Sequence, residues 1–435
     1  MLRRFISLRN FSSTSRLFRP KLSSSYTSKE LWDERFNCKF LTDFDLMKSI
    51  NTKITGSEEL DELELDIFIN IAAPQKNEIA HLKETVDLLK KFRRSLRAHL
   101  MFPSTPHAAC RLFLDSDRLH SLVHLIEQRV DYGIFPDPFA LNLSFDAALE
   151  HNHLSLASRL AVHIMLQEDF GVNTISDIFS LYSVSKYIES KPDFEQWSSP
   201  DISSDPIFTV ALKDQSAQSK SQNEKPEEEE EDEDQYIRVP FLRNPYYDDH
   251  FDIKNPRVLC GKTLVMLSKQ FSLEQDLTQK LKLIGFVLQG KWDESLGISK
   301  GCVQSNLRVG PLKELVKHYI TNLHGVQELT EDAKATLLSD LDKLSADGKS
   351  LSEHAEDKTD QFGHIEKEDI NRLRSDIVSW SEQRQAIRSA YDEWAERQRT
   401  IEEIKKKKEE LERKEEFLYF YDNLRKRTLG RLELD

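Results

Sequence analysis

The sequence predicts an all-α protein, in which a short α-solenoid of helical hairpins is followed by a long, coiled-coil-like C-terminal helix. Two short turns of the same form lie 36 residues apart, with an apolar helical hairpin between them. Of the 435 residues only 13 are Gly and 14 are Pro, while 31% are charged, a composition typical of helical proteins. Neither Gly nor Pro occurs from His364 to Leu429. One hairpin cannot bury its apolar face alone, so we expect the hairpins to stack.

The repeated turn is the most informative local feature. The first turn, Gly133–Asp137, precedes an apolar helix predicted at about 139–149. A second helix, predicted at 154–170, ends in the turn Gly171–Asn173. Each turn has an aromatic residue, a glycine, a β-branched residue and then Asp or Asn. One hairpin in roughly 34–36 residues, punctuated in this way, is typical of an α-solenoid repeat.

This unit resembles a pentatricopeptide repeat through the stretches YGIFPD, PFALNL and LASRLAVHIM. In that family a Gly-x-x-Pro-Asp turn precedes each unit, and residues near the start of the first helix read single-stranded RNA. The resemblance implies base reading by Asn142, the fifth residue counted from Pro138. The alternative is that Asn142 is a cap or a solvated residue, as an Asn at a helix start usually is. A single repeat also reads only one base, which weakens the base-reading interpretation.

Apolar residues at spacings of three and four predict further helices on both sides of this unit. The helix before Pro74, for example, has apolar residues at Leu60, Leu63 and Ile67. The predicted helical segments are 58–73, 78–98, 103–131 (a hairpin through Leu119) and 174–189. Together with the central unit they define a predicted domain of pentatricopeptide-like hairpins, residues 30–190.

Beyond this domain the composition and the helical pattern of the chain change twice. Residues 191–234 are predicted to be a disordered acidic insertion, because Ser, Asp, Gln, Lys and Glu dominate there. Helical patterns return at 257–271 and 274–289, which predicts a further hairpin within residues 235–300. Residues 301–363 are predicted to be a polar linker with short helices.

Residues 364–430 are predicted to form one long charged helix, which could span roughly 100 Å if unbroken. Apolar residues fill eight of the ten heptad positions from 370 to 401, and Arg384 and Gln398 occupy the other two. Such a seam has to be buried against a partner helix, another subunit or the solenoid. Near the end, Lys405–Lys408 is either a solvated face or a phosphate contact.

The first 28 residues carry a targeting signal. Residues 1–28 contain no acidic residue, five arginines and many serines. Leu2, Phe5 and Ile6 share one helical face. An amphipathic, Arg-rich and Ser-rich terminus without acids predicts a mitochondrial transit peptide, with a disordered basic tail as the alternative. We expect cleavage after Phe11 or near residues 16–18, so that the mature chain begins between residues 12 and 23.

Charge and cysteine content limit the function further. The formal net charge is −14, and residues 224–234 contribute more than half of it through nine acids and one lysine. The rest of the chain is only mildly acidic, so local basic patches remain possible. The four cysteines are far apart and predict buried free thiols in a reducing compartment: Cys38, Cys110, Cys260 and Cys302. No apolar run reaches the roughly 18 residues that a membrane span requires.

Motifs of catalytic chemistry are weak. The GKT at Gly261–Thr263 invites a phosphate-loop interpretation, but Pro256 stands where that motif requires glycine. His120 and His124 lie four residues apart without a third metal ligand in a zincin pattern. The carboxylates and imidazole of residues 247–252 are consecutive, so they cannot all face one ion. We therefore expect no enzyme, no cofactor, no metal and no small-molecule substrate.

A basic cluster is the main candidate for RNA contact. Five cations occur within eight residues at the end of the first predicted hairpin: Lys90, Lys91, Arg93, Arg94 and Arg97. The functional interpretation is that they bind phosphates. The alternative is that they compensate the C-terminus of a helix, which requires only one or two cations.

The order of these parts resembles the subunit twenty-seven family of the mitochondrial ribosome small subunit, a pentatricopeptide-type family. YGIFPDPFALNL, LAVHIMLQEDF and IFSLYSV carry the match, with weaker agreement in 257–290 and in the C-terminal helix. The resemblance implies a non-catalytic structural protein of the mitochondrial matrix. It would bind mitochondrial small-subunit rRNA and neighbouring mitochondrial ribosomal proteins in support of translation. The acidic run does not belong to the family pattern.

Two other functions remain open. A free organellar RNA-binding pentatricopeptide factor, for transcript stability or translation, would normally carry many more repeats than the three or four found here. A coiled-coil protein scaffold would explain the apolar seam, but it would leave the basic cluster unexplained.

Overall fold

The computed structural model describes most of the chain between residues 19 and 432. The described ranges are 19–37, 44–56, 60–71, 78–192, 194, 197, 205–208, 253–271, 274–305, 307–322, 331–345 and 347–432. Within them the chain is helical, and one isolated bridge joins Arg308 and Ser345. The prediction of an all-α fold is confirmed. The chain divides into two units, Met1–Ile377 and Val378–Asp435.

The first unit contains the following helices. They are α1 (Lys29–Asp33), α2 (Phe44–Thr55), α3 (Glu62–Ile71), α4 (Glu78–Arg94), α5 (Ser104–Asp115), α6 (Leu119–Glu127), α7 (Arg129–Tyr132), α8 (Pro138–Glu150), α9 (Leu154–Gln167), α10 (Thr174–Glu189), α12 (Pro256–Gln270), α13 (Gln275–Gln289), α14 (Trp292–Gln304), α15 (Leu312–Asn322), α16 (Glu331–Lys343), α17 (Leu351–Asp357) and the first part of α18 (Phe362–Leu432).

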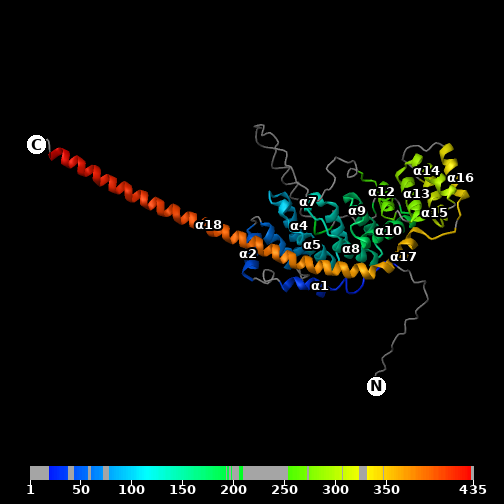
Figure 1. The fold of residues 1–435 in the computed structure, drawn as a ribbon, viewed down its shortest axis with the longest axis horizontal. Helices are drawn as coiled ribbons and strands as arrows, with labels where there is room; N and C mark the ends of the chain where they lie inside the picture. The colour runs from blue at the N-terminus through cyan, green and yellow to red at the C-terminus, as the bar shows by residue number, and fades with distance from the viewer. Residues whose placement is uncertain are drawn as a thin grey trace, which may run out of the picture. The chain divides into compact units, whose positions relative to one another are not determined.

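These helices stack in two rows (Figure 1). In the first row α3 packs on α5, α5 on α8, and α8 on α10. In the second row α6 packs on α9 and α9 on α12. The stack continues through α12 and α13 to α14 and α16. Helical hairpins therefore bury their apolar faces against their neighbours, as the sequence predicts for a repeat architecture.

An aromatic residue recurs in the first row. Phe113 of α5, Phe145 of α8 and Phe179 of α10 are each fully buried, at spacings of 32 and 34 residues. The rings of Phe145 and Phe179 stack with centroids 5.7 Å apart. The repeat spacing of the sequence thus brings equivalent apolar residues into contact across successive helices.

The two turns of the repeated unit have the backbone that their glycines permit. Gly133 ends α7 at a φ of +71°, and Gly171 has a φ of +88°, both in the left-handed region. Asn173 then caps α10, because its side chain accepts hydrogen bonds from the N–H groups of Ile175 and Ser176. This cap explains why α10 begins where the sequence predicts.

Two glycines explain how α12 and α13 pack. A Cβ on Gly261 would lie 2.6 Å from the carbonyl oxygen of Gly285, and a Cβ on Gly285 would lie 2.9 Å from that of Gly261. Only glycine allows the two backbones to approach so closely. The GKT sequence lies inside α12, so its glycine serves helix packing and does not form a phosphate loop.

Two regions beyond the predicted hairpins also contribute to the first unit. Residues 301–363 were predicted to be a polar linker with short helices, and their described part includes the packed helices α15, α16 and α17. Their buried apolar residues include Leu312, Val316, Leu337 and Leu341. In the predicted insertion, Ile207 and Phe208 are buried, and Ser121 donates a hydrogen bond to Asp205 at 2.6 Å. The acidic run 224–234 lies outside the described residues.

The second unit is the remainder of α18, from Val378 onward. The helix, Phe362–Leu432, matches the predicted range 364–430 closely. The predicted seam is buried at Trp380 and Arg384, whereas Trp394 is 62% exposed. The end of the seam is therefore an exposed face within this unit.

Candidate nucleic-acid interface

The basic cluster lies at the C-terminal end of α4 and in the turn after it. Lys91, Arg94 and Arg97 are exposed, and Lys90 is half-buried. Arg97 lies 3.6 Å from Glu62 of α3, but its side chain remains more than half exposed. Glu62 is itself buried, at 6% exposure, so the pair is open to solvent only on the Arg97 side. Four of the five predicted cations are thus accessible on one short segment.

Arg93 differs from the rest of the cluster because it is buried. Its Nε donates a hydrogen bond to the carbonyl oxygen of Val130 at 3.1 Å. Its aliphatic part lies under Gly133, where an added Cβ would be 3.1 Å from the Arg93 Cδ. Burial lowers the pKa of the guanidinium. Arg93 therefore supports the turn that opens the repeated unit, and it does not belong to the accessible surface.

Asn142, the predicted base reader, is fully buried. Its amide nitrogen donates to the Tyr26 hydroxyl at 3.1 Å and to Asn173 Oδ1 at 3.3 Å. Its oxygen accepts a hydrogen bond from Ser176 at 2.7 Å. The amide thus links α8 to α10 and to the N-terminal segment. The prediction that this side chain faces a base does not fit this arrangement, since its donors are used internally.

Tyr26 was not recognised from the sequence, although it is central to this network. Its ring stacks on Phe139 with centroids 4.0 Å apart. Its hydroxyl donates to Asp369 of α18 at 3.3 Å, and Asn173 donates to the same carboxylate at 2.9 Å. No local signal marks Tyr26, because its partners come from distant parts of the chain.

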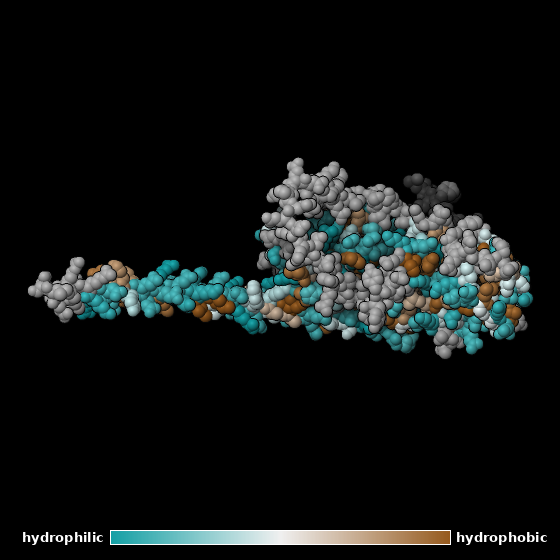
Figure 2. Space-filling view, turned by 90° about the horizontal axis from the view of Figure 1, so that it is seen from above, coloured by the Kyte–Doolittle hydropathy of each residue, from teal (hydrophilic) through white to brown (hydrophobic). Residues whose placement is uncertain are grey.

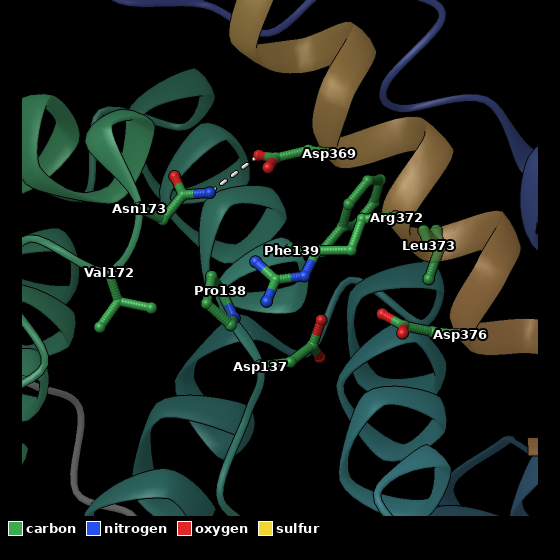
Figure 3. A pocket seen from close by; sticks show the side chains of 9 residues that line it. All are labelled: Asp137, Pro138, Phe139, Val172, Asn173, Asp369, Arg372, Leu373 and Asp376. Carbon is green, nitrogen blue, oxygen red and sulfur yellow. Dashed lines mark hydrogen bonds between the residues drawn. The ribbon is translucent and has the colours of Figure 1, made fainter. Parts of the chain in front are cut away.

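A cleft of about 240 Å³ lies where the two repeated turns face α18 (Figure 3). The turn residues on one side include Asp137 and Asn173. Asp369, Arg372 and Asp376 of α18 lie on the other side. In Figure 3 the Arg372 guanidinium points toward Asp137. The resemblance implies that residues at these helix starts read RNA. In the structure the helix starts instead face α18, a helix of the same chain.

The electrostatics of this cleft disfavour a phosphate. Burial opposes ionisation of Asp137, but the imidazole of His107, 2.8 Å away, lowers the pKa of that carboxyl overall. Burial raises the pKa values of Asp369 and Asp376. His107 and Arg111 already compensate Asp137, so a phosphate entering the cleft would meet the cation of Arg372 beside the two carboxyl groups of Asp369 and Asp376. The cleft is therefore an unfavourable site for a phosphate.

The other sequence candidates fall into structural positions. Within the described ranges, no group of three or more His, Cys, Asp or Glu side chains could hold a metal ion. His120 lies beside His153, with ring centroids 5.1 Å apart, and His124 packs on Phe208. Residues 247–252 lie outside the described part of the chain. Burial raises the pKa values of the Cys110 and Cys260 thiols, which are free and buried as expected.

No helix in the described part of the chain is long and apolar enough to cross a membrane.

The fold and the site define an all-α repeat-type protein with an accessible basic surface. Its features are stacked helical hairpins, a cationic helix end and a long charged helix. The family follows from a comparison of the whole sequence. The model of the family described as mitochondrial 28S ribosomal protein S27 matches residues 1–417, and the chain belongs to this family. It is accordingly a ribosome-associated protein of the mitochondrion, in the small subunit.

Proposed function

We propose that this chain is a non-catalytic structural protein of the mitochondrial small ribosomal subunit. It contacts rRNA phosphates through Lys90, Lys91, Arg94 and Arg97, and it contacts neighbouring ribosomal proteins through α18. Both contacts support mitochondrial translation. Family membership supports the setting. The observation that carries the rRNA contact is the accessibility of these cations at one helix end, where three are exposed and Lys90 is half-buried.

Local charge, and not total charge, supports this assignment. The chain is acidic overall, at −14, so it has no general affinity for a polyanion. The four accessible cations follow one another over eight residues, and the buried Arg93 fixes the end of their helix against the turn at Gly133. A cationic segment on a rigid support holds the protein in register on RNA without reading its sequence.

The pentatricopeptide-like hairpins serve in this proposal as a spacer. The base-reading position is occupied internally by Asn142, and the adjacent turns face α18. This arrangement favours a ribosomal structural role over a free organellar RNA-binding factor, which would need accessible code residues on its repeats.

The N-terminal segment is included in the proposal as a transit peptide that is removed on import. The predicted peptide is acid-free through residue 28, but Leu22 and Tyr26 are buried in the fold. Cleavage before Arg19 would retain both residues, and the sites after Phe11 and near residues 16–18 satisfy this condition. N-terminal sequencing of the protein from mitochondria tests the assignment. A mature terminus beyond Tyr26, or an intact Met1, would contradict it.

The rRNA contact is tested by replacing the four accessible cations with glutamine and titrating the full chain with a small-subunit rRNA transcript. The slope of log affinity against log salt should flatten by roughly one for each phosphate that the variant no longer binds. The matched control replaces four exposed lysines elsewhere: Lys254, Lys269, Lys291 and Lys300. If both variants change the slope equally, binding is non-specific. If neither changes it, the protein is a scaffold without this RNA contact.

A further inference from the structure

The strongest unassigned feature lies near the end of α18, within the second unit. Five consecutive residues, 417–421, read FLYFY, and each is between 54% and 69% exposed. Successive helical residues are about 100° apart, so five of them surround the helix completely. A helix that is apolar on all sides is normally buried. Figure 2 shows hydrophobic residues gathered near the C-terminal end of an otherwise mainly hydrophilic helix.

One face of this segment is a shallow groove that combines carboxylates with aromatic rings. Its residues are Glu412, Glu415, Glu416, Tyr419, Phe420 and Asn423. Their spacing of three and four places them in one stripe along the helix. On the adjacent face, the rings of Phe417 and Tyr421 pack edge to face with centroids 4.7 Å apart.

The groove has the chemistry of a guanidinium site. An arginine side chain can form paired hydrogen bonds with a carboxylate and can also stack on an aromatic ring. Both kinds of group are present here in one stripe. Arginine and aromatic residues are also the residues enriched at the centres of protein interfaces.

The charge of the groove itself disfavours RNA as its occupant, while basic residues flank the groove at Lys405–Lys408 and Arg425–Arg427. Residues 409–416 contain five acids and two bases. A base could stack on Tyr419 or Phe420, but its phosphates would then lie close to the carboxylates of Glu415 and Glu416. A protein surface carries no such obligatory negative charge.

We propose that residues 412–424 form a docking site for an arginine-bearing segment of a neighbouring protein. The arginine enters the groove between the carboxylates and the two rings, and apolar partner surface encloses the aromatic segment around it. The inference rests on the proposed function, in that the neighbour is a protein of the small ribosomal subunit. It adds the chemistry and the location of the contact.

The decisive experiment places a photo-crosslinking residue at Tyr419 in the full chain and isolates small subunits from mitochondria. A crosslink to another protein, through a peptide that contains arginine, is the expected result. A crosslink to rRNA, a crosslink to a second copy of this chain, or no crosslink from subunit-bound protein would each overturn the proposal. A probe at Glu402, on the same helix, reports background.

Variants at the groove give a second measurement. With the probe moved to Phe417, E412Q/E415Q/E416Q should reduce the yield of the protein crosslink at least about tenfold, because interface hot spots have effects of this size. The matched control, E396Q/E402Q/E403Q, removes the same charge from exposed positions on the same helix and should leave the yield unchanged. Equal losses in both variants would overturn the groove as the site.

Co-sedimentation with the small subunit keeps the two proposals separate. If the groove variants still sediment with the subunit while the crosslink goes to rRNA, the docking inference fails and the proposed function stands. If the unmodified chain does not sediment with the subunit, the proposed function itself fails. The altered side chains are exposed, so helicity measured by circular dichroism should not change.

Discussion

Residues 132–190 and the second unit use the same kinds of side chain in opposite ways. In the repeated hairpin, polar groups such as Asn142 and Asn173 are buried and bonded to one another. In the second unit, apolar groups such as Trp394 and Phe420 are exposed. The repeat therefore uses its polar side chains to hold helices together, while the long helix presents its apolar side chains outward. Burial, and not residue type, distinguishes the two regions.

The largest expected effect is on stability in the hairpin. Phe145→Ala removes a fully buried ring that stacks on Phe179, so the free energy of unfolding should fall by about 3–5 kcal/mol. Urea unfolding followed by circular dichroism measures this loss. Phe420→Ala is the matched control in the second unit and should change the value by less than about 0.5 kcal/mol. Equal losses at both positions would remove the distinction between the two regions.

The next effect is a pH dependence that arises inside the hairpin. Burial raises the pKa of Asp177 to about 7, while the hydrogen bond from Gly171 N–H opposes the rise. Between about pH 4 and pH 7 the folded state therefore holds a proton that the unfolded chain has released. The free energy of unfolding should fall as pH rises through this range, by up to about 4 kcal/mol. Asp177→Asn cannot titrate, so the difference between wild type and variant isolates this contribution. A difference that is constant from pH 4 to pH 7 would refute it.

A smaller effect separates structure from base reading at Asn142. Asn142→Ala leaves the Ser176 hydroxyl without its acceptor and removes one of the two hydrogen bonds of the Tyr26 hydroxyl, which should lower the free energy of unfolding by about 1–3 kcal/mol. The salt slope for an rRNA transcript should stay unchanged, because the side chain is buried. Loss of RNA affinity without loss of stability would instead support sequence reading by the repeat.

The smallest effect is expected at Trp394. Its side chain is 62% exposed, so Trp394→Ala should change the free energy of unfolding of the isolated chain by less than about 0.5 kcal/mol. The same variant should be released from isolated small subunits at lower salt, if α18 contacts neighbouring proteins there. A stability loss comparable with that of Phe145→Ala would show that the seam is buried in the free chain.

Local patterns predicted the helices well, and they failed wherever the answer depended on distant residues. The start of α10 follows from Asn173, a capping residue that acts only on the next turn. The count of cations at Lys90–Arg97 identified a basic segment, but it could not separate the buried Arg93 from its exposed neighbours, because Val130 and Gly133 decide that burial. The sequence already disfavoured a phosphate loop at the GKT, because Pro256 stands where that motif requires glycine, but it could not show that Gly261 packs on Gly285. The family resemblance, which depends on the order of parts, was confirmed.

The meeting of Tyr26 with Asp369 has a consequence for the order of folding. The two residues are 343 positions apart, so this contact cannot form until the start of α18 has been synthesised. Most hairpins of the stack join segments close in the chain and can form earlier and faster. Until then, the Phe139 ring that Tyr26 covers, and the turns that α18 faces, lack part of their final surroundings.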